Sequence, residues 1–364
     1  MGSTPTVYDV AAAAGVSTAT VSRFFRSPDK VKAATQESIR HAVDELGYIP
    51  SGLARGLAER HSGVVGFYSF SGHEPDELLM PEPGDPDTVR VVSDASTRPR
   101  LFPLFADEVL RGIELECTVQ GLPLAVGWQK RDAGGVALDE IARRVDGLVV
   151  LPHVMSEPML ARLARTKPIV VVSQEPPAGT DLCSVTVNNR GGMHALVTHM
   201  IQVHGVRDFW FAGPVDDYDR TQRHDGFESA IREAGLVPPN GLKLEATRGR
   251  YDARDELLKM LRAERVRLPE AVVCANDQTA LGVIEAFSEA GIRVPEDVAV
   301  TGFDGIDAGR FIQPGLTTVR QPMDLLGRMA VRMLSERMDD PSASPAHTVL
   351  PVQLLLRHSC GCSG

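Results

Sequence analysis

The chain has 364 residues, of which 43% are hydrophobic and 24% charged, a globular composition that excludes a wholly disordered protein. No apolar run approaches the roughly 20 residues that span a bilayer, and the N-terminus lacks a secretory pattern, so we expect a cytoplasmic protein without a membrane segment. The net charge of −10 is uneven, because residues 1–61 hold seven Lys/Arg against six Asp/Glu whereas residues 62–364 hold 31 against 42. Contact with a polyanion is therefore expected only in the first 61 residues.

Residues 6–47 are predicted to form three short helices. Thr6 and Asp9 fit a capping box before the first helix, and Ser17 can cap the second. Gly15 suits the tight turn between them. The expected helices are 7–14, 18–25 and 35–46. Two helices joined by a short turn that contains glycine form a helix-turn-helix, a unit that binds DNA.

Residues 51–61 are predicted to link this unit to the remainder of the chain. Gly52 and Gly56 each weaken an isolated helix by roughly 1 kcal/mol relative to alanine. A helix this short is marginal on its own, so we expect the linker to be mostly unfolded in the absence of a partner.

From residue 62 onwards, buried strands alternate with helices, a pattern that predicts α/β architecture with doubly wound parallel sheets. The expected strands are 63–70, 122–128, 147–151, 169–173, 184–187, 209–212, 271–274 and 298–302, and the expected helices include 104–120, 191–204, 223–234, 252–262, 278–290 and 324–338. The length fits two subdomains, with a ligand cleft at the carboxyl ends of their strands. No G-x-G-x-x-G follows the first strand and no Walker motif is present, so we expect no nucleotide cofactor.

The chain ends in Cys360-Gly361-Cys362, and three histidines (His194, His199 and His204) fall at helical spacing in one expected helix. A spacing of one residue is poor for holding zinc with both thiolates, and neither a second C-x₂-C nor His-x₃-His is present. We therefore expect no metal or cofactor, with the cysteines in a structural tail and the histidines on one helix face. No G-x-S-x-G string supports Ser-His-Asp catalysis, so we expect no enzyme activity.

The strings VYDVA (7–11), AGVSTATVSR (14–23) and LGYIP (46–50) resemble the DNA-binding head of the LacI/GalR repressor family. The resemblance implies that Thr18, Ala19 and Arg23 face base edges in the major groove. An arginine can bond guanine O6 and N7 together, and the methyl groups of threonine and alanine can contact thymine. Hydroxyls suited to phosphate oxygens are those of Thr6, Ser17, Thr20 and Ser22, for which a helix cap or a solvated face is the alternative.

In the same family, the segment that corresponds to residues 51–61 folds only on DNA. The match at Ala54-Arg55-x-Leu57 implies that Arg55 contacts DNA and that Leu57 is a wedge between central base pairs in the minor groove. The alternative is a plain linker whose leucine packs on the rest of the protein.

The strings VDGL (145–148), ANDQTALG (275–282), GIRVPEDVAVTGFD (291–304) and LTTVRQP (316–322) are similar to the effector-binding core of this family, which shares the fold of periplasmic sugar-binding proteins. By analogy we expect a DNA-binding head at 1–50, a hinge at 51–61 and a core at 62–364. The chain would cross between subdomains near 176–184, 319–322 and 341–347. This gives an N-subdomain of about 62–180 with 321–341 and a C-subdomain of about 181–320 with 342–364.

The resemblance also implies which residues bind the effector: Leu104, Phe105, Arg223, Tyr251, Asn276 and Asp304. Leu104 and Phe105 are equally good core candidates, whereas Asp277 is expected to be a carboxylate in the first turn of a helix. Two departures stand out. Residues 71–100 form an insertion, which is either a disordered loop or a segment over the cleft. Position 173 is serine where some sugar-binding members carry aspartate, which puts ordinary monosaccharide binding in doubt.

These features together predict a ligand-responsive transcriptional regulator, most simply a repressor, that binds a pseudo-palindromic operator as a homodimer, with a tetramer as the alternative. Its partners would be double-stranded operator DNA and a sugar, nucleoside or other polar metabolite, with no membrane partner. The competing interpretations are a solute-binding protein of a transport system and an activator controlled by a protein partner.

Overall fold

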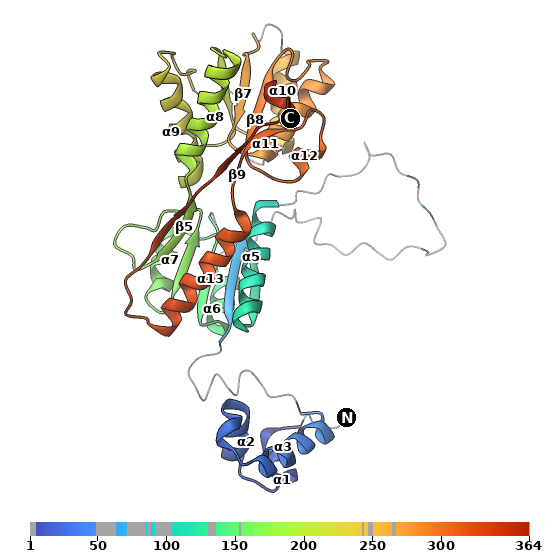
Figure 1. Ribbon diagram of the computed structural model, residues 1–364, viewed down its shortest axis with the longest axis vertical. Coiled ribbons are helices and arrows are strands. Elements are labelled where there is room, and N and C mark those ends of the chain that lie inside the picture. Colours follow the sequence, from blue (N-terminus) through green and yellow to red (C-terminus); the bar gives the residue numbers. More distant parts are fainter. Residues whose placement is uncertain are drawn as a thin grey trace. The chain divides into compact units, whose positions relative to one another are not determined.

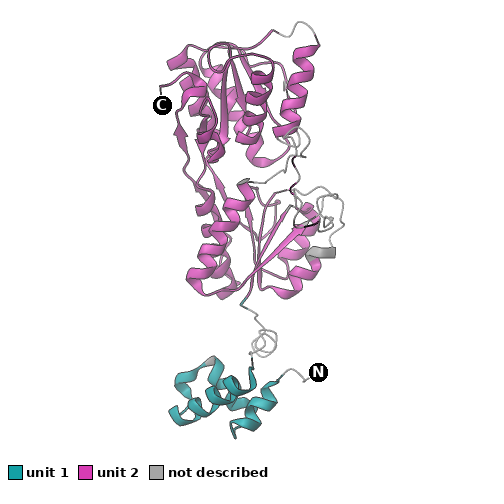
Figure 2. Ribbon diagram, turned by 90° about the vertical axis from the view of Figure 1, so that its right-hand side faces the viewer, with its two compact units in different colours: residues 1–63 teal, residues 64–364 magenta. Residues whose placement is uncertain are grey.

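The computed structural model describes residues 5–48, 63–70, 85, 89, 91, 104–129, 136–152, 154–241, 244–246, 250–263 and 267–363. They form two compact units, 1–63 and 64–364, which Figure 2 distinguishes by colour. In these ranges no helix combines the length and the apolarity that crossing a membrane requires. The expected hinge with Arg55 and Leu57, and the insertion at 71–100 apart from residues 85, 89 and 91, lie outside the described residues.

The first unit contains the three predicted helices, α1 (Val7–Ala13), α2 (Thr18–Arg26) and α3 (Ala33–Leu46), with a 3₁₀ turn at Pro28–Lys30 between the last two. Their core is small and apolar, with Val10, Val21 and Ile39 fully buried. The capping box is present, because the Thr6 amide and hydroxyl both donate to Asp9 Oδ2, at 2.8 and 2.7 Å. Local sequence signals thus place all three helices to within about two residues.

The second unit consists of two α/β lobes (Figure 1). The first lobe has a six-stranded parallel sheet in the order β10-β5-β4-β3-β1-β2. Its elements are β1 (Val65–Phe70), α5 (Leu104–Gln120), β2 (Leu124–Gln129), α6 (Val136–Arg144), β3 (Gly147–Val150), α7 (Glu157–Ala164), β4 (Ile169–Val172), β5 (Cys183–Val187), α13 (Met323–Asp339) and β10 (His347–Leu350). The continuous burial of β3, β4 and β5 is that of strands covered on both faces.

The second lobe has a five-stranded sheet in the order β11-β9-β8-β7-β6. Its elements are α8 (Asn189–His204), β6 (Phe209–Ala212), α9 (Tyr218–Glu233), α10 (Arg250–Arg262), β7 (Ala271–Cys274), α11 (Asp277–Glu289), β8 (Ala299–Asp304), α12 (Ala308–Phe311), β9 (Thr317–Arg320), β11 (Gln353–Leu355) and the 3₁₀ turn η4 (His358–Cys360). The pairs among β6 to β9 are parallel, as predicted, whereas the edge strand β11 runs antiparallel to β9.

The chain passes between the lobes three times, and two of the predicted crossing points are wrong. The first crossing follows β5 at about residue 188 rather than 176–184, because β5 pairs with β4 in the first sheet. The third follows β10 at about 351–352 rather than 341–347, because β10 pairs with β5. The second, at 321–322, lies where it was predicted. The boundaries expected at residues 180 and 342 therefore move to about 188 and 351.

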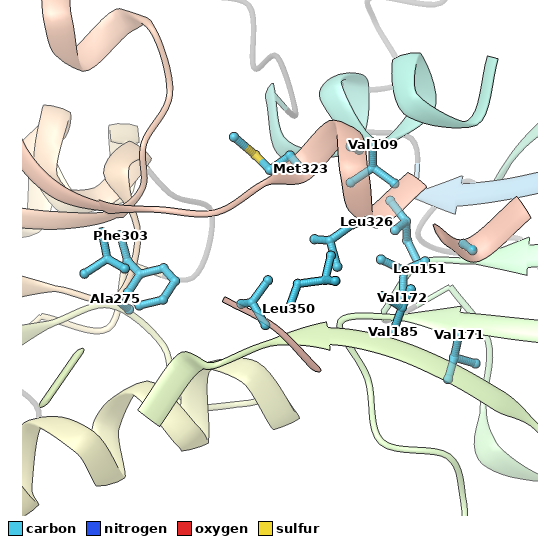
Figure 3. Close-up of a cluster of buried hydrophobic side chains, with 14 of the residues drawn as sticks. Val109, Leu151, Val171, Val172, Val185, Ala275, Phe303, Met323, Leu326 and Leu350 are labelled. Atoms are coloured by element: carbon cyan, nitrogen blue, oxygen red, sulfur yellow. The ribbon is translucent and has the colours of Figure 1, made fainter. Parts of the chain in front are cut away.

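A cluster of buried side chains continues from the first sheet through the crossings into the second lobe. Figure 3 shows part of it, with Leu326 and Leu350 from the first lobe, and Phe303 and Ala275 from the second. Met323, directly after the second crossing, belongs to the same cluster. The residues that flank the crossings are thus held by apolar packing, which positions both walls of the cavity described below.

Helices α5 and α13 pack closely through two glycines. A Cβ added at Gly327 would lie 2.1 Å from the Val109 carbonyl oxygen, and one at Gly112 would lie 1.9 Å from that of Asp324. We expect Gly327→Ala to lower the free energy of unfolding by about 1–3 kcal/mol, because the helices must separate to accept the methyl group. Chemical denaturation checks this. The control is Gly315→Ala, whose added Cβ meets only ordinary contacts at 3.5 Å or more. Equal stabilities of the two variants would contradict the close packing.

Candidate functional site

A cavity of about 250 Å³ lies between the two lobes of the second unit. Its lining residues follow the carboxyl ends of strands in both sheets, as doubly wound folds predict. From the first lobe come Ser69, Phe105, Ala106, Leu151, Pro152 and Ser173, and from the second Asp217, Asp219, Arg220, Arg223, Asn276, Gln278, Asp304 and Ile306. Four predicted effector residues, Phe105, Arg223, Asn276 and Asp304, are therefore brought together.

Arg223 is a buried guanidinium in the second turn of α9. Its Nε donates to Asn189 Oδ1 at 2.8 Å, and its Nη1 donates to the Ala275 carbonyl at 2.8 Å and to Asp304 Oδ1 at 3.3 Å. The guanidinium carbon lies 3.9 Å from the centroid of the Phe303 ring, within cation–π distance. The side chain is thus held in one orientation at the cavity wall.

Asp304 ends β8 and faces Arg223. Its Oδ1 also accepts a hydrogen bond from Gln321 Nε2 at 2.7 Å. Burial raises the pKa of this carboxyl, and the charge of Arg223 and the bond from Gln321 only partly offset that effect. Its φ of 130° lies in the left-handed region, where a non-glycine residue is strained. The strand end therefore orients the carboxylate toward the cavity at a cost in backbone energy.

Asp219 is a buried carboxylate that the sequence analysis did not identify. Its Oδ1 accepts a hydrogen bond from Thr186 Oγ1 at 2.8 Å, across the boundary between the lobes. Burial raises its pKa, against the opposing charge of Arg223. The nearby Ser173 hydroxyl also lowers that pKa by hydrogen bonding, although the geometry falls short of a well-formed bond. Among the described residues, Asp219 Oδ2 and Ser173 Oγ are both buried and have no other partner, so a ligand in the cavity can satisfy them.

The omission of Asp219 has a local cause. The sequence placed the start of this helix at residue 223, whereas α9 begins at Tyr218 with Asp217 as its N-cap. Asp217 Oδ1 accepts from the Arg220 backbone amide at 2.7 Å, so the signal in the sequence was Asp217 itself, a residue type preferred at the N-cap. The extra turn carries Asp219 and Arg220 to the cavity.

The other predicted effector residues differ in their placement. Asn276 lines the cavity as the N-cap of α11, so its Oδ1 is engaged by the Thr279 amide at 2.9 Å and its amide nitrogen is the group available to a ligand. Leu104 begins α5, one residue before Phe105, and its side chain lies outside the described atoms. Tyr251 is on the first turn of α10, next to Arg250, and is not among the described residues that line the cavity.

Asp277 has the structural role that was expected for it. This fully buried residue starts α11, and its Oδ2 accepts from the Gly305 and Ile306 amides at 2.8 and 2.9 Å. Its Oδ1 accepts from Thr318 Oγ1 at 2.6 Å. Burial and the charge of Asp304 raise its pKa. The carboxylate therefore joins α11 to the loop after β8 and does not line the cavity.

In the first unit, α2 exposes the residues expected to contact bases. Ala19 and Arg23, one helical turn apart, are exposed, and Thr18 is half-buried. Ser17 caps α2 by accepting from the Thr20 amide at 3.2 Å, and its hydroxyl lies 2.9 Å from Thr20 Oγ1. The hydroxyls of Thr6, Ser17 and Thr20 thus have local partners, and Ser22 is half-buried with a partner of its own.

Comparison with known proteins covers both units. Residues 6–51 match the profile of bacterial regulatory proteins of the lacI family, and residues 197–360 match a periplasmic binding protein-like domain. The transcriptional repressor PurR of Haemophilus influenzae is 32% identical over 338 residues, which are 92% of this chain and 91% of that protein. The ribose operon repressor of Escherichia coli K12 is 30% identical over 362 residues, covering 97% and 99%.

Among solved structures, the lac repressor dimer bound to operator and the anti-inducer ONPF aligns over 98% of this chain and 99% of that chain. The TM-score is 0.78 at 24% identity, a likeness of fold.

Proposed function

Since the chain belongs to the lacI family of bacterial regulatory proteins and is a DNA-binding transcriptional repressor, we propose that a polar small molecule in the cavity between its lobes controls its operator affinity. The observation that carries this proposal is that the polar residues of the cavity are hydrogen-bonded to residues at the crossings. Arg223 bonds Asn189 beside the first crossing, and Asp304 bonds Gln321 in the second.

The proposed mechanism is a change in the relative angle of the lobes. Asp219 is bonded to Thr186 in the opposite lobe, and a ligand that engages Oδ2 of Asp219 would also contact the groups that hold the crossings. A ligand that binds one angle better than another shifts the population toward that angle. If the two angles also differ in operator affinity, the ligand changes operator affinity by the same factor by which the operator changes ligand affinity.

The chemistry of the cavity favours a polyhydroxylated or nucleoside-like ligand. Carboxylates at positions 219 and 304 accept hydrogen bonds, whereas Arg223 and the Asn276 amide group donate them. Phe105, from the opposite lobe, supplies apolar surface for a ring. We place the effector among sugars and nucleosides, bound without chemical turnover, so it should be recovered unchanged after incubation.

For DNA binding, we propose that Thr18, Ala19 and Arg23 contact base edges and that Thr6, Ser17, Thr20 and Ser22 contact phosphates, with Arg55 and Leu57 contributing from the hinge. A homodimer supplies two copies of α2 to the two halves of a pseudo-palindrome, because a two-fold operator mirrors a two-fold protein. The protein would then act in the cytoplasm, where the operator lies.

A thermal-shift screen of sugars and nucleosides, followed by operator titrations with each hit, tests the proposal. We expect a true effector to raise the melting temperature and to change the operator Kd by about 5–150-fold, the range of typical allosteric coupling. Asp219→Asn should weaken binding of the hit. The control is Asp225→Asn, an exposed position on the same helix, which should leave it unchanged. A hit that binds at the cavity without altering operator affinity would contradict the coupling.

A further inference from the structure

Four side chains with metal-binding atoms meet in the second lobe, where the end of α8 contacts the C-terminal tail. The tail is defined here as residues 356–363, which follow β11. The four are His199 and His204 of α8, and Cys360 and Cys362 of the tail. All four donor atoms lie within 4.8 Å of one another. None of the four is among the described residues that line the cavity between the lobes.

The distances within this cluster are those of ligands around a common centre. Cys362 Sγ lies 3.5 Å from His199 Nε2 and 3.4 Å from His204 Nε2, and the two Nε2 atoms are 3.2 Å apart. In a tetrahedral zinc site with Zn–S of about 2.3 Å and Zn–N of about 2.05 Å, neighbouring sulfur and nitrogen atoms are about 3.6 Å apart and two nitrogens about 3.3 Å. Both rings thus direct the same nitrogen toward the thiol, at the separations that a zinc ion requires.

The backbone explains how residues of unfavourable spacing come together. The α8 helix ends at His204, followed by Gly205 in the left-handed region, so the last histidine is at the helix terminus. Gly361 has a φ of 99°, a conformation that favours glycine, and it turns the chain between the two cysteines. A side chain at Gly361 would be strained and would meet the His204 ring at 3.4 Å. This turn is the feature that the argument from C-x-C spacing did not include.

The tail is anchored to the second sheet by Ser359, which is not one of the four metal-binding residues. The Ser359 hydroxyl donates to the Val300 carbonyl at 2.6 Å and accepts from the Thr317 amide at 2.8 Å. The Thr317 hydroxyl lies 3.0 Å from Cys360 Sγ, where it can donate to a thiolate. A hydrogen bond of this kind orients a metal ligand and supports its charge. The cluster therefore stands on preformed structure.

We propose that His199, His204, Cys360 and Cys362 bind one zinc(II) ion, which ties the C-terminal tail to the end of α8. Two thiolates and two imidazoles form the set typical of a closed, structural zinc site, and the spacing His-x₄-His lies within the usual range. The two thiol protons leave to solvent when the ion binds, so affinity should rise with pH.

Cobalt(II) and zinc(II) titrations of the tagless, chelator-treated full chain under reducing conditions test the proposal. We expect cobalt to give the thiolate-to-metal charge-transfer absorption and the intense visible bands of a tetrahedral site, saturating at one equivalent. Zinc should displace it stoichiometrically. Zinc should also raise the melting temperature and slow carboxypeptidase digestion of the tail.

The matched variants are chosen so that loss of folding does not imitate loss of binding. His199→Asn and Cys362→Ser change half-buried ligands and should each abolish the tetrahedral cobalt spectrum, with circular dichroism unchanged. Two histidines outside the cluster serve as controls. His358 is an exposed residue of the same tail, and His194 lies on α8, where its side chain bonds Glu233 of α9. The variants His358→Asn and His194→Asn should both bind cobalt as the wild type does. Three results would overturn the proposal: octahedral cobalt without charge transfer, a tetrahedral spectrum that survives both ligand changes, or a Cys360–Cys362 disulfide that persists under reductant.

Discussion

Replacing Arg23 by alanine is expected to weaken operator binding by about 1–3 kcal/mol and to abolish discrimination at one base pair of each half-site. The reason is that Arg23 is exposed on α2 and its guanidinium can bond guanine O6 and N7 together. Binding of random DNA, which depends on phosphate contacts, should change little. Titrations of wild type and variant against the operator and against single-base substitutions measure both effects.

The control for Arg23 is Arg40→Ala, which removes an exposed cation of α3 that is paired with Glu37. It should change the affinities for operator and for random DNA by the same factor. An equal loss on both kinds of DNA for Arg23→Ala would show that Arg23 contacts phosphate and does not specify sequence.

The second large effect is expected at Asp304. Asp304→Ala removes the carboxylate that faces the buried Arg223 guanidinium, and breaking a buried ion pair from one side costs about 3–5 kcal/mol of stability. The remaining bonds of Arg223 to Asn189 and Ala275 favour the lower end of that range. The same variant should lose the response of operator affinity to the effector. Chemical denaturation and operator titrations with and without effector measure the two results.

Asp304→Asn separates these effects, because an amide oxygen can still accept from Gln321 while the charge is gone. Since burial raises the pKa of Asp304, protonation of this group stabilises the fold below its ordinary pKa of 3.8, and that contribution is lost as pH rises through the raised pKa. The free energy of unfolding of the asparagine variant should therefore depend less on pH than that of the wild type, between pH 3.8 and the raised pKa of Asp304. Wild-type effector affinity in both variants would remove Asp304 from the site.

The sequence predicted most elements but misplaced two of the three points at which the chain changes lobes. The α5 helix has the predicted bounds of 104–120, because its apolar period and flanking breakers are local. By contrast, the crossing near 176–184 was inferred by analogy with the family, and the assignment of β5 to the first sheet depends on pairing with β4. Strand pairing between distant segments has no local signal, so periodicity alone could not place these boundaries.

The site residues also fall into those that the sequence identified and those that it missed. Arg223, Asn276 and Asp304 were identified because they follow strands or match family strings, and strand ends of parallel sheets meet at one edge. Asp219 was missed because a helix start was placed five residues late. The histidine and cysteine cluster was missed because its two halves are about 160 residues apart and meet only through the left-handed turn at Gly361.

The three crossings limit how the lobes can move. In the first sheet β5 and β10, which lead into two of the crossings, are neighbours at one edge, and in the second sheet β9 and β11 are neighbours at an edge as well. The covalent connections are thus gathered along one side, whereas β2 and β6 at the opposite edges have no such link. Sliding of one lobe over the other would strain three connections at once, but rotation about the connected side strains them little. In the mechanism proposed above, the free energy of effector binding would therefore be directed into a single angular motion.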